Sequence, residues 1–189
     1  MVGHAQYVYT SSGGTITNAI SSSPADIPST TTFEMPATGF FGQIIDARVS
    51  LYITYAADQD LSIVLISPSG VQVPLLQNRE NAAGTVDNSV GATGADFGTG
   101  CGDSARTVFE DAASNEISTS TAPYVGLFKP VYPFEFAALD GESASQANGE
   151  WQLQITDFRN AAPSGNLTCW SLFLDSTDLI FRDGFELLQ

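Results

Sequence analysis

The chain has 189 residues, of which 21 are acidic and only 6 are basic, so its net charge is −15 at pH 7. A surface this negative repels phosphate backbones and anionic lipids, which argues against binding to nucleic acids or to anionic membranes. Hydrophobic residues make up 43% of the chain, enough for the core of one domain, and no apolar run approaches the ~20 residues that span a bilayer.

The chain opens with Met1-Val2-Gly3-His4, which lacks the charged and apolar regions of a signal peptide. We therefore expect a fragment of a longer precursor, in which residues 1–14 are a flexible lead or a remnant of expression. The Ser/Thr/Gly-rich stretch that follows predicts a short strand around Thr15–Asn18 and then a loop.

Hydrophobic alternation predicts the next strands. From Ile45 to Tyr55, apolar and polar residues alternate with a period of two, as in a strand with one buried face. Leu61–Ser67 is rich in β-branched and aliphatic residues, Pro68–Gly70 has the composition of a turn, and Val71–Leu76 runs back. These three segments predict a β-hairpin.

The second half of the chain opens with a long loop, residues 78–105, which is rich in Gly, Ala, Asn and Asp. Further on, Trp151–Thr156 alternates again, which predicts a strand with Trp151 in the core. Leu167–Asp175 is the last core strand, and the tail, residues 176–189, is either one more edge strand or a sorting segment.

Short strands, Gly/Pro turns and the absence of a helical period predict an all-β fold. We expect an antiparallel β-sandwich with jelly-roll topology over residues 15–175.

The two cysteines, Cys101 and Cys169, are either reduced and buried or joined in a disulfide. The rest of the composition is typical of an exported protein, which favours the disulfide. It would close a long loop and stabilise the fold by ~4 kcal/mol. Two cysteines and one histidine cannot form the usual structural zinc site.

Hydrolase chemistry has little support. His4, the only histidine, lies in the extreme N-terminal segment, whereas a catalytic histidine is held by packing against its nucleophile. A glycosidase needs two carboxylates at a suitable separation, but pairs of acids arise by chance in a chain with 21 of them. The acid pairs that lie near each other in the sequence are Asp58 with Asp60, Glu110 with Asp111, and Glu142 with Glu150. No catalytic residue is predicted.

Acidic residues at strand ends and in loops have two interpretations. Asp60 and Asp157 either cap turns by accepting hydrogen bonds from backbone amides, or one of them binds calcium, which prefers oxygen ligands, together with the loop acids. The candidate calcium ligands are Asp103, Glu110, Asp111 and Asp157.

An ordered series of motifs resembles the P domain (P/Homo B domain) of kexin-like and furin-like proprotein convertases, in its bacterial exported form. The motifs are Ile44–Ser50, Asp60–Gly70, Thr107–Asp111, Pro130–Phe136, Asn148–Asp157 and Gly165–Leu172.

The resemblance implies a non-catalytic accessory domain of a secreted serine endopeptidase. Such a domain packs in cis against a subtilisin-like catalytic domain and assists its folding and stability. The resemblance also implies an extracellular location and strengthens the calcium interpretation.

The alternative is an extracellular binding module for a carbohydrate, a protein substrate or a cell surface. Its candidate surface is aromatic, although alternation would turn many of these side chains into the core. The residues are Tyr124, Phe128, Tyr132, Phe134 and Phe136.

Overall fold

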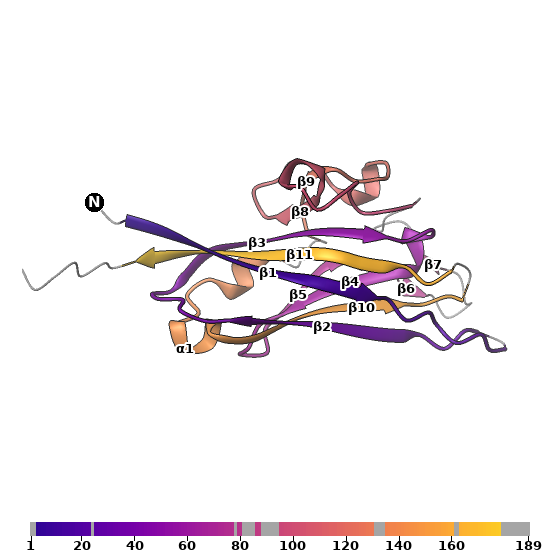
Figure 1. The fold of residues 1–189 in the computed structure, drawn as a ribbon, viewed down its shortest axis with the longest axis horizontal. Coiled ribbons are helices and arrows are strands. Elements are labelled where there is room, and N and C mark those ends of the chain that lie inside the picture. Colours follow the sequence, from indigo (N-terminus) through magenta and orange to yellow (C-terminus); the bar gives the residue numbers. More distant parts are fainter. Residues whose placement is uncertain are drawn as a thin grey trace, which may run out of the picture.

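Two β-sheets lie face to face in a sandwich, as the alternation in the sequence predicts (Figure 1). The structure, a computed structural model, describes residues 3–23, 25–77, 79–80, 86–87, 95–130, 135–160 and 163–178. The five-stranded sheet has the order β1-β11-β3-β8-β9, and the four-stranded sheet has the order β2-β10-β4-β5.

The strands of the five-stranded sheet are β1 (Gly3–Thr15), β3 (Ile44–Thr54), β8 (Thr107–Glu110), β9 (Gly126–Phe128) and β11 (Asn166–Asp178). Those of the four-stranded sheet are β2 (Ser29–Ala37), β4 (Leu61–Ile66), β5 (Gln72–Leu76) and β10 (Gly149–Asp157). A separate two-stranded ribbon pairs β6 (Arg79–Glu80) with β7 (Val86–Asp87). All pairings between these strands are antiparallel except that of β8 with β9.

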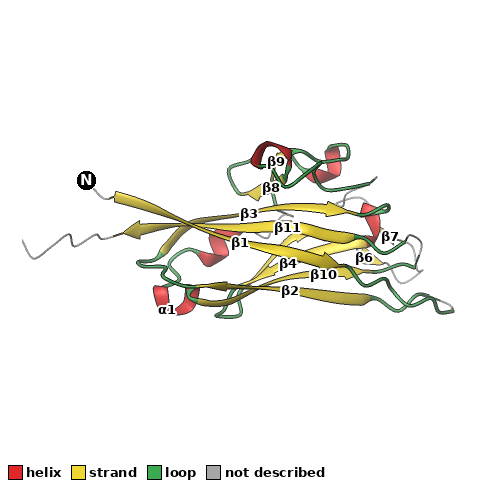
Figure 2. Cartoon of the chain, in the orientation of Figure 1, coloured by secondary structure: helices red, strands yellow, loops and turns green. Residues whose placement is uncertain are grey.

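Helical segments are short and lie between or beside the strands (Figure 2). They are η1 (Asp58–Asp60), η3 (Asp103–Ala105), η4 (Ile117–Thr119), η5 (Phe136–Leu139) and α1 (Ala144–Ala147), of which only α1 is α-helical. Within the described residues, no helix is long and apolar enough to cross a membrane.

The chain passes repeatedly from one sheet to the other. It runs from β1 in the first sheet to β2 in the second, back to β3, across to β4, and finally from β10 to β11. This alternation between layers is the topology of a jelly roll, so the predicted fold class is confirmed.

The core lies between the two sheets and is built by residues of one parity on each central strand. Trp151, Leu153 and Ile155 on β10 are fully buried, and they face the five-stranded sheet. Trp151, predicted as a core residue, also donates a hydrogen bond from its indole nitrogen to the carbonyl oxygen of Ala147 at 2.8 Å. The other strands contribute, among others, Val49, Leu51, Ile53, Leu61, Ile63, Leu65, Trp170, Leu172 and Leu174.

The prediction that residues 1–14 form a flexible lead is wrong for those of them that the structure describes. Residues 3–15 form β1, which pairs with β11 from Gly3 opposite Asp178 to Thr15 opposite Asn166. The two strands approach so closely that a side chain at Gly13 would collide with the carbonyl group of Leu167. The sequence predicts a strand at Thr15–Asn18, but the strand in the structure, β1, ends at Thr15.

β2 was not predicted at all. Its sequence, Ser-Thr-Thr-Thr-Phe-Glu-Met-Pro-Ala, alternates only weakly, and just Met35 and Ala37 are buried. It forms the edge of the four-stranded sheet beside β10, where Pro36 is tolerated because an edge strand needs hydrogen bonds on one side only.

Candidate functional site

Three fully buried aspartates lie at one end of the sandwich, and we call them the Asp cluster: Asp58, Asp60 and Asp157. Asp58 and Asp60 belong to η1, the short helix between β3 and β4. Asp157 is the last residue of β10 and pairs with Leu61, the first residue of β4. The main chain also joins η1 to β10, because the amide of Phe158 donates to the carbonyl oxygen of Asp60 at 2.9 Å.

The carboxylate of Asp157 is held by main-chain donors. The amide of Ala19 donates to its Oδ2 and the amide of Arg159 to its Oδ1, both at 3.0 Å. The predicted role of Asp157 in capping a turn is thus confirmed.

Asp60 differs. Both of its side-chain oxygens are buried, and they accept no hydrogen bond from any residue that the structure describes. The capping role predicted for this side chain is wrong.

Burial and neighbouring carboxylates raise the pKa values of Asp58 and Asp60. Burial, followed by the charge of Asp96, raises the pKa of Asp58 to about 8. Burial and the neighbouring Asp157 raise the pKa of Asp60 to about 6, although the positive charge of Arg159 acts in the opposite direction.

Tyr55 and Asp96 border the Asp cluster. Burial raises the pKa of Tyr55, and the carboxylates of Asp157, Asp60 and Asp58 raise it further. Asp96 closes this end of the sandwich by accepting a hydrogen bond from the amide of Tyr55 on its Oδ1 at 2.8 Å.

A sequence signal points to Asp157 as a buried group. It has the same parity as Trp151, Leu153 and Ile155 on β10, so its side chain follows theirs toward the interior. Asp58 and Asp60 carry no such signal, since η1 breaks the alternation between β3 and β4.

The remaining candidate calcium ligands have other surroundings. Asp103 begins η3 and is exposed, while Glu110 ends β8 and forms an ion pair with Arg48 at 3.9 Å. Asp111 accepts hydrogen bonds from the amides of Phe136 and Ala137, each at 2.9 Å.

The structure therefore gives the four predicted ligands different partners. The charge of Asp157 raises the pKa of Asp60, whereas the charge of Asp111 raises the pKa values of Asp46 and Asp140. Across the described part of the chain, no three His, Cys, Asp or Glu side chains form a group arranged to hold a metal ion.

Removal of the Asp111 side chain should destabilise the fold. Asp111→Ala leaves two main-chain donors without their acceptors, and we expect the free energy of unfolding to fall by about 1–3 kcal/mol. Urea titration followed by tryptophan fluorescence measures the change. Asp103→Ala removes an exposed carboxylate and is the matched control. Equal midpoints for the two variants would contradict this role.

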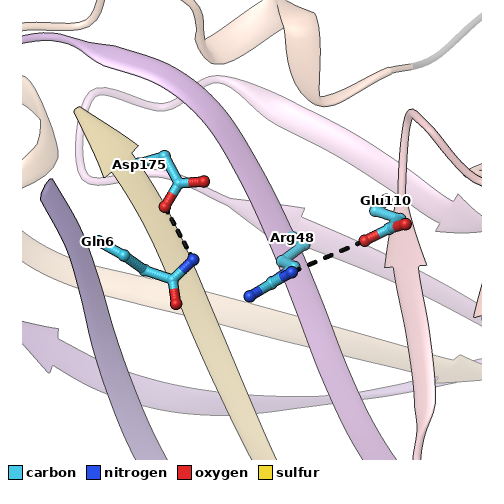
Figure 3. Close-up of polar contacts among 4 residues, drawn as sticks. All are labelled: Gln6, Arg48, Glu110 and Asp175. Atoms are coloured by element: carbon cyan, nitrogen blue, oxygen red, sulfur yellow. Dashed lines mark hydrogen bonds and ion pairs between the residues drawn. The ribbon is translucent and has the colours of Figure 1, made fainter. Parts of the chain in front are cut away.

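The outer face of the five-stranded sheet carries a row of polar contacts across adjacent strands (Figure 3). Arg48 on β3 lies 4.6 Å from the ring centre of Phe173 on β11 and reaches Glu110 on β8. Two residues further along β11, Asp175 accepts a hydrogen bond from the side chain of Gln6 on β1 at 2.9 Å. These contacts join four strands, β1, β11, β3 and β8.

The segment before β8 is fixed onto the same face. A disulfide joins Cys101 to Cys169 on β11, as predicted. Arg106 donates from Nε to the carbonyl oxygen of Cys101, and from Nη1 to the hydroxyls of Ser50 and Ser171. The far end of the predicted long loop is therefore anchored to β3 and β11.

The prediction of an aromatic binding surface is wrong for every one of its residues that the structure describes. Tyr124, Phe128 and Phe136 are at most 5% exposed and belong to the core. Tyr132 and Phe134 lie outside the described residues.

The fold and these contacts define a jelly-roll module closed by a disulfide. Residues 44–98 match the model of the proprotein convertase P-domain. This segment includes β3, η1, β4 and β5, together with Asp58 and Asp60. The resemblance to the P domain is confirmed over this segment.

No curated protein matches the chain. The chain is similar to the crystal structure of the serine protease of Aeromonas sobria, with 16% identity, a TM-score of 0.48, and coverage of 93% of this chain and 28% of that one. It is similar also to the complex of the Aeromonas sobria serine protease with its chaperone, with 14% identity, a TM-score of 0.46, and coverage of 92% and 27%. The chain thus spans less than a third of the length of each matched chain.

Proposed function

We propose that this chain is a non-catalytic accessory domain of a secreted serine protease and packs in cis against a subtilisin-like catalytic domain. The P-domain match over residues 44–98 carries the proposal, because it covers one central strand of each sheet, β3 and β4. The P domain of the convertases follows such a catalytic domain and is needed for its folding.

Two features of the chain support the finer parts of the proposal. The disulfide between Cys101 and Cys169 suits the oxidising environment of an exported protein. His4, the only histidine, is exposed on the edge strand β1, whereas a general base is normally held in place by packing and by a third group.

Deletion of this segment from the reading frame that encodes it tests the accessory role. We expect deletion of the segment for residues 3–178, with the rest of the frame intact, to abolish mature protease in the medium, because the catalytic domain would lose the surface against which it folds. Immunoblotting and peptide hydrolysis measure the outcome.

A Glu150→Gln variant of the intact frame, altered at an exposed residue, is the control for expression. Undiminished mature protease without the segment would overturn the proposal, as would a reading frame that encodes no protease domain.

A further inference from the structure

Asp60 is a buried carboxyl group for which the described structure shows no hydrogen-bond partner. The residue is 1% exposed, and neither side-chain oxygen accepts a hydrogen bond from the described residues. A carboxylate removed from water without compensation is strongly destabilising, so such a group is usually paired with a cation or a metal ion.

The surroundings of Asp60 supply further oxygen atoms. Asp60 and Asp157 lie next to each other, because Asp157 pairs with Leu61 and the amide of Phe158 donates to the carbonyl oxygen of Asp60 at 2.9 Å. The charges of both carboxylates also raise the pKa of the neighbouring Tyr55 hydroxyl. Asp157 is fully buried, and its two main-chain donors, the amides of Ala19 and Arg159, fix its orientation. Each of its oxygens accepts one of these bonds and has a further lone pair for another partner.

We propose that Asp60 and Asp157 bind one calcium ion, whose remaining ligands are main-chain carbonyl oxygens and water. Two carboxylates neutralise one divalent cation, and calcium accepts six to eight oxygen ligands of these mixed kinds in a flexible geometry. The proposal needs two acidic side chains, which agrees with the absence of a ready-made group of three among the described residues.

All the proposed ligands are oxygen atoms, and this favours calcium over zinc and magnesium. Zinc favours nitrogen and sulfur ligands, which these residues do not provide. Magnesium gives up its water reluctantly and demands a near-ideal octahedron, so a site built from a short helix and a strand end favours calcium.

Thermal unfolding of the full chain tests the site without reference to any protease. After treatment with EDTA and its removal, calcium chloride at about a hundred times its dissociation constant should raise the midpoint by about 5–10 °C. Magnesium chloride at the same concentration should give a much smaller shift.

Two matched variants locate the effect. Asp60→Asn should abolish the calcium shift, whereas Asp103→Asn, which removes the same charge from an exposed position, should keep it. In EDTA at about pH 8, where Asp60 has lost its proton, Asp60→Asn should be at least as stable as the native chain, because it removes a buried negative charge beside Asp157.

Several outcomes would overturn the proposal: no calcium shift in the native chain, an equal shift with magnesium, or a shift that survives Asp60→Asn. If Asp60→Asn does not fold, crystals of the native chain grown in calcium decide the matter. An anomalous peak between Asp60 and Asp157 supports the site, and its absence from a crystal that contains calcium contradicts it.

Discussion

Replacement of both Cys101 and Cys169 by serine is expected to lower the free energy of unfolding by about 4 kcal/mol. The disulfide joins residues 68 positions apart, so its loss frees a long loop in the unfolded chain and increases the entropy of that state. The folded chain also loses the anchor of the segment before β8, where Arg106 contacts the carbonyl oxygen of Cys101.

Urea titration of the oxidised chain, the reduced chain and the double variant measures this effect. The reduced chain and the variant should unfold at similar denaturant concentrations, well below that of the oxidised chain. The variant should also be insensitive to dithiothreitol, which controls for other effects of the reductant. A double variant that matches the oxidised chain would show that the crosslink adds no stability.

The central strands were predictable because each has one buried face. The alternation from Ile45 to Tyr55 and from Trp151 to Thr156 reports directly on the environment of the side chains, and the structure places strands at both segments. The P-domain motifs could be found for the same reason, since the family match covers β3, β4 and β5.

The edge strands were missed because their stability depends on distant partners. β1 is rich in Ser, Thr and Gly and alternates between exposed and partly buried residues, and its partner β11 lies at the other end of the described chain. Local composition suggested a flexible lead, but pairing along most of β11 overrides it. β2 depends on β10 in the same way.

The site could be predicted only in part. The sequence marks Asp60 and Asp157 as acids at strand ends, and the structure confirms this position for Asp157 and places Asp60 directly before β4. Their burial and their coupling arise from tertiary structure, because η1 and the end of β10 are more than 90 residues apart and meet through the pairing of β4 with β10. Composition alone could not separate these acids from the exposed Asp103.

In the absence of metal ions, the fold should become less stable as the pH rises from about 5 to about 8. The carboxyls of Asp58 and Asp60 have pKa values raised from 3.8 to about 8 and about 6 in the folded chain. A raised pKa means that the folded chain holds a proton which the unfolded chain has released, so the stabilisation is complete below the unfolded pKa and is lost as the pH passes the folded value.

The groups that face these carboxyls set the direction of the effect. Burial is the largest cause of the raised pKa of both carboxyls. The charge of Asp96 raises the pKa of Asp58 further, and the charges of Asp157 and, more weakly, Asp26 raise that of Asp60. Arg159 opposes the shift of Asp60 without cancelling it. The hydroxyl of Tyr55 stays protonated throughout, because its pKa is raised as well.

Each carboxyl that keeps its proton only in the folded chain lowers the free energy of unfolding by at most about 1.4 kcal/mol per pH unit. We expect the midpoint of thermal unfolding in EDTA to fall by about 5 °C or more over this range. Asp58→Asn should flatten the profile, because the amide does not titrate, whereas Asp103→Asn should leave it unchanged. A profile that rises with pH in EDTA would show that these carboxyls are charged in the folded chain. In saturating calcium the part of the decline that Asp60 contributes should disappear, since metal binding favours the deprotonated ligands, whereas the part that Asp58 contributes should remain.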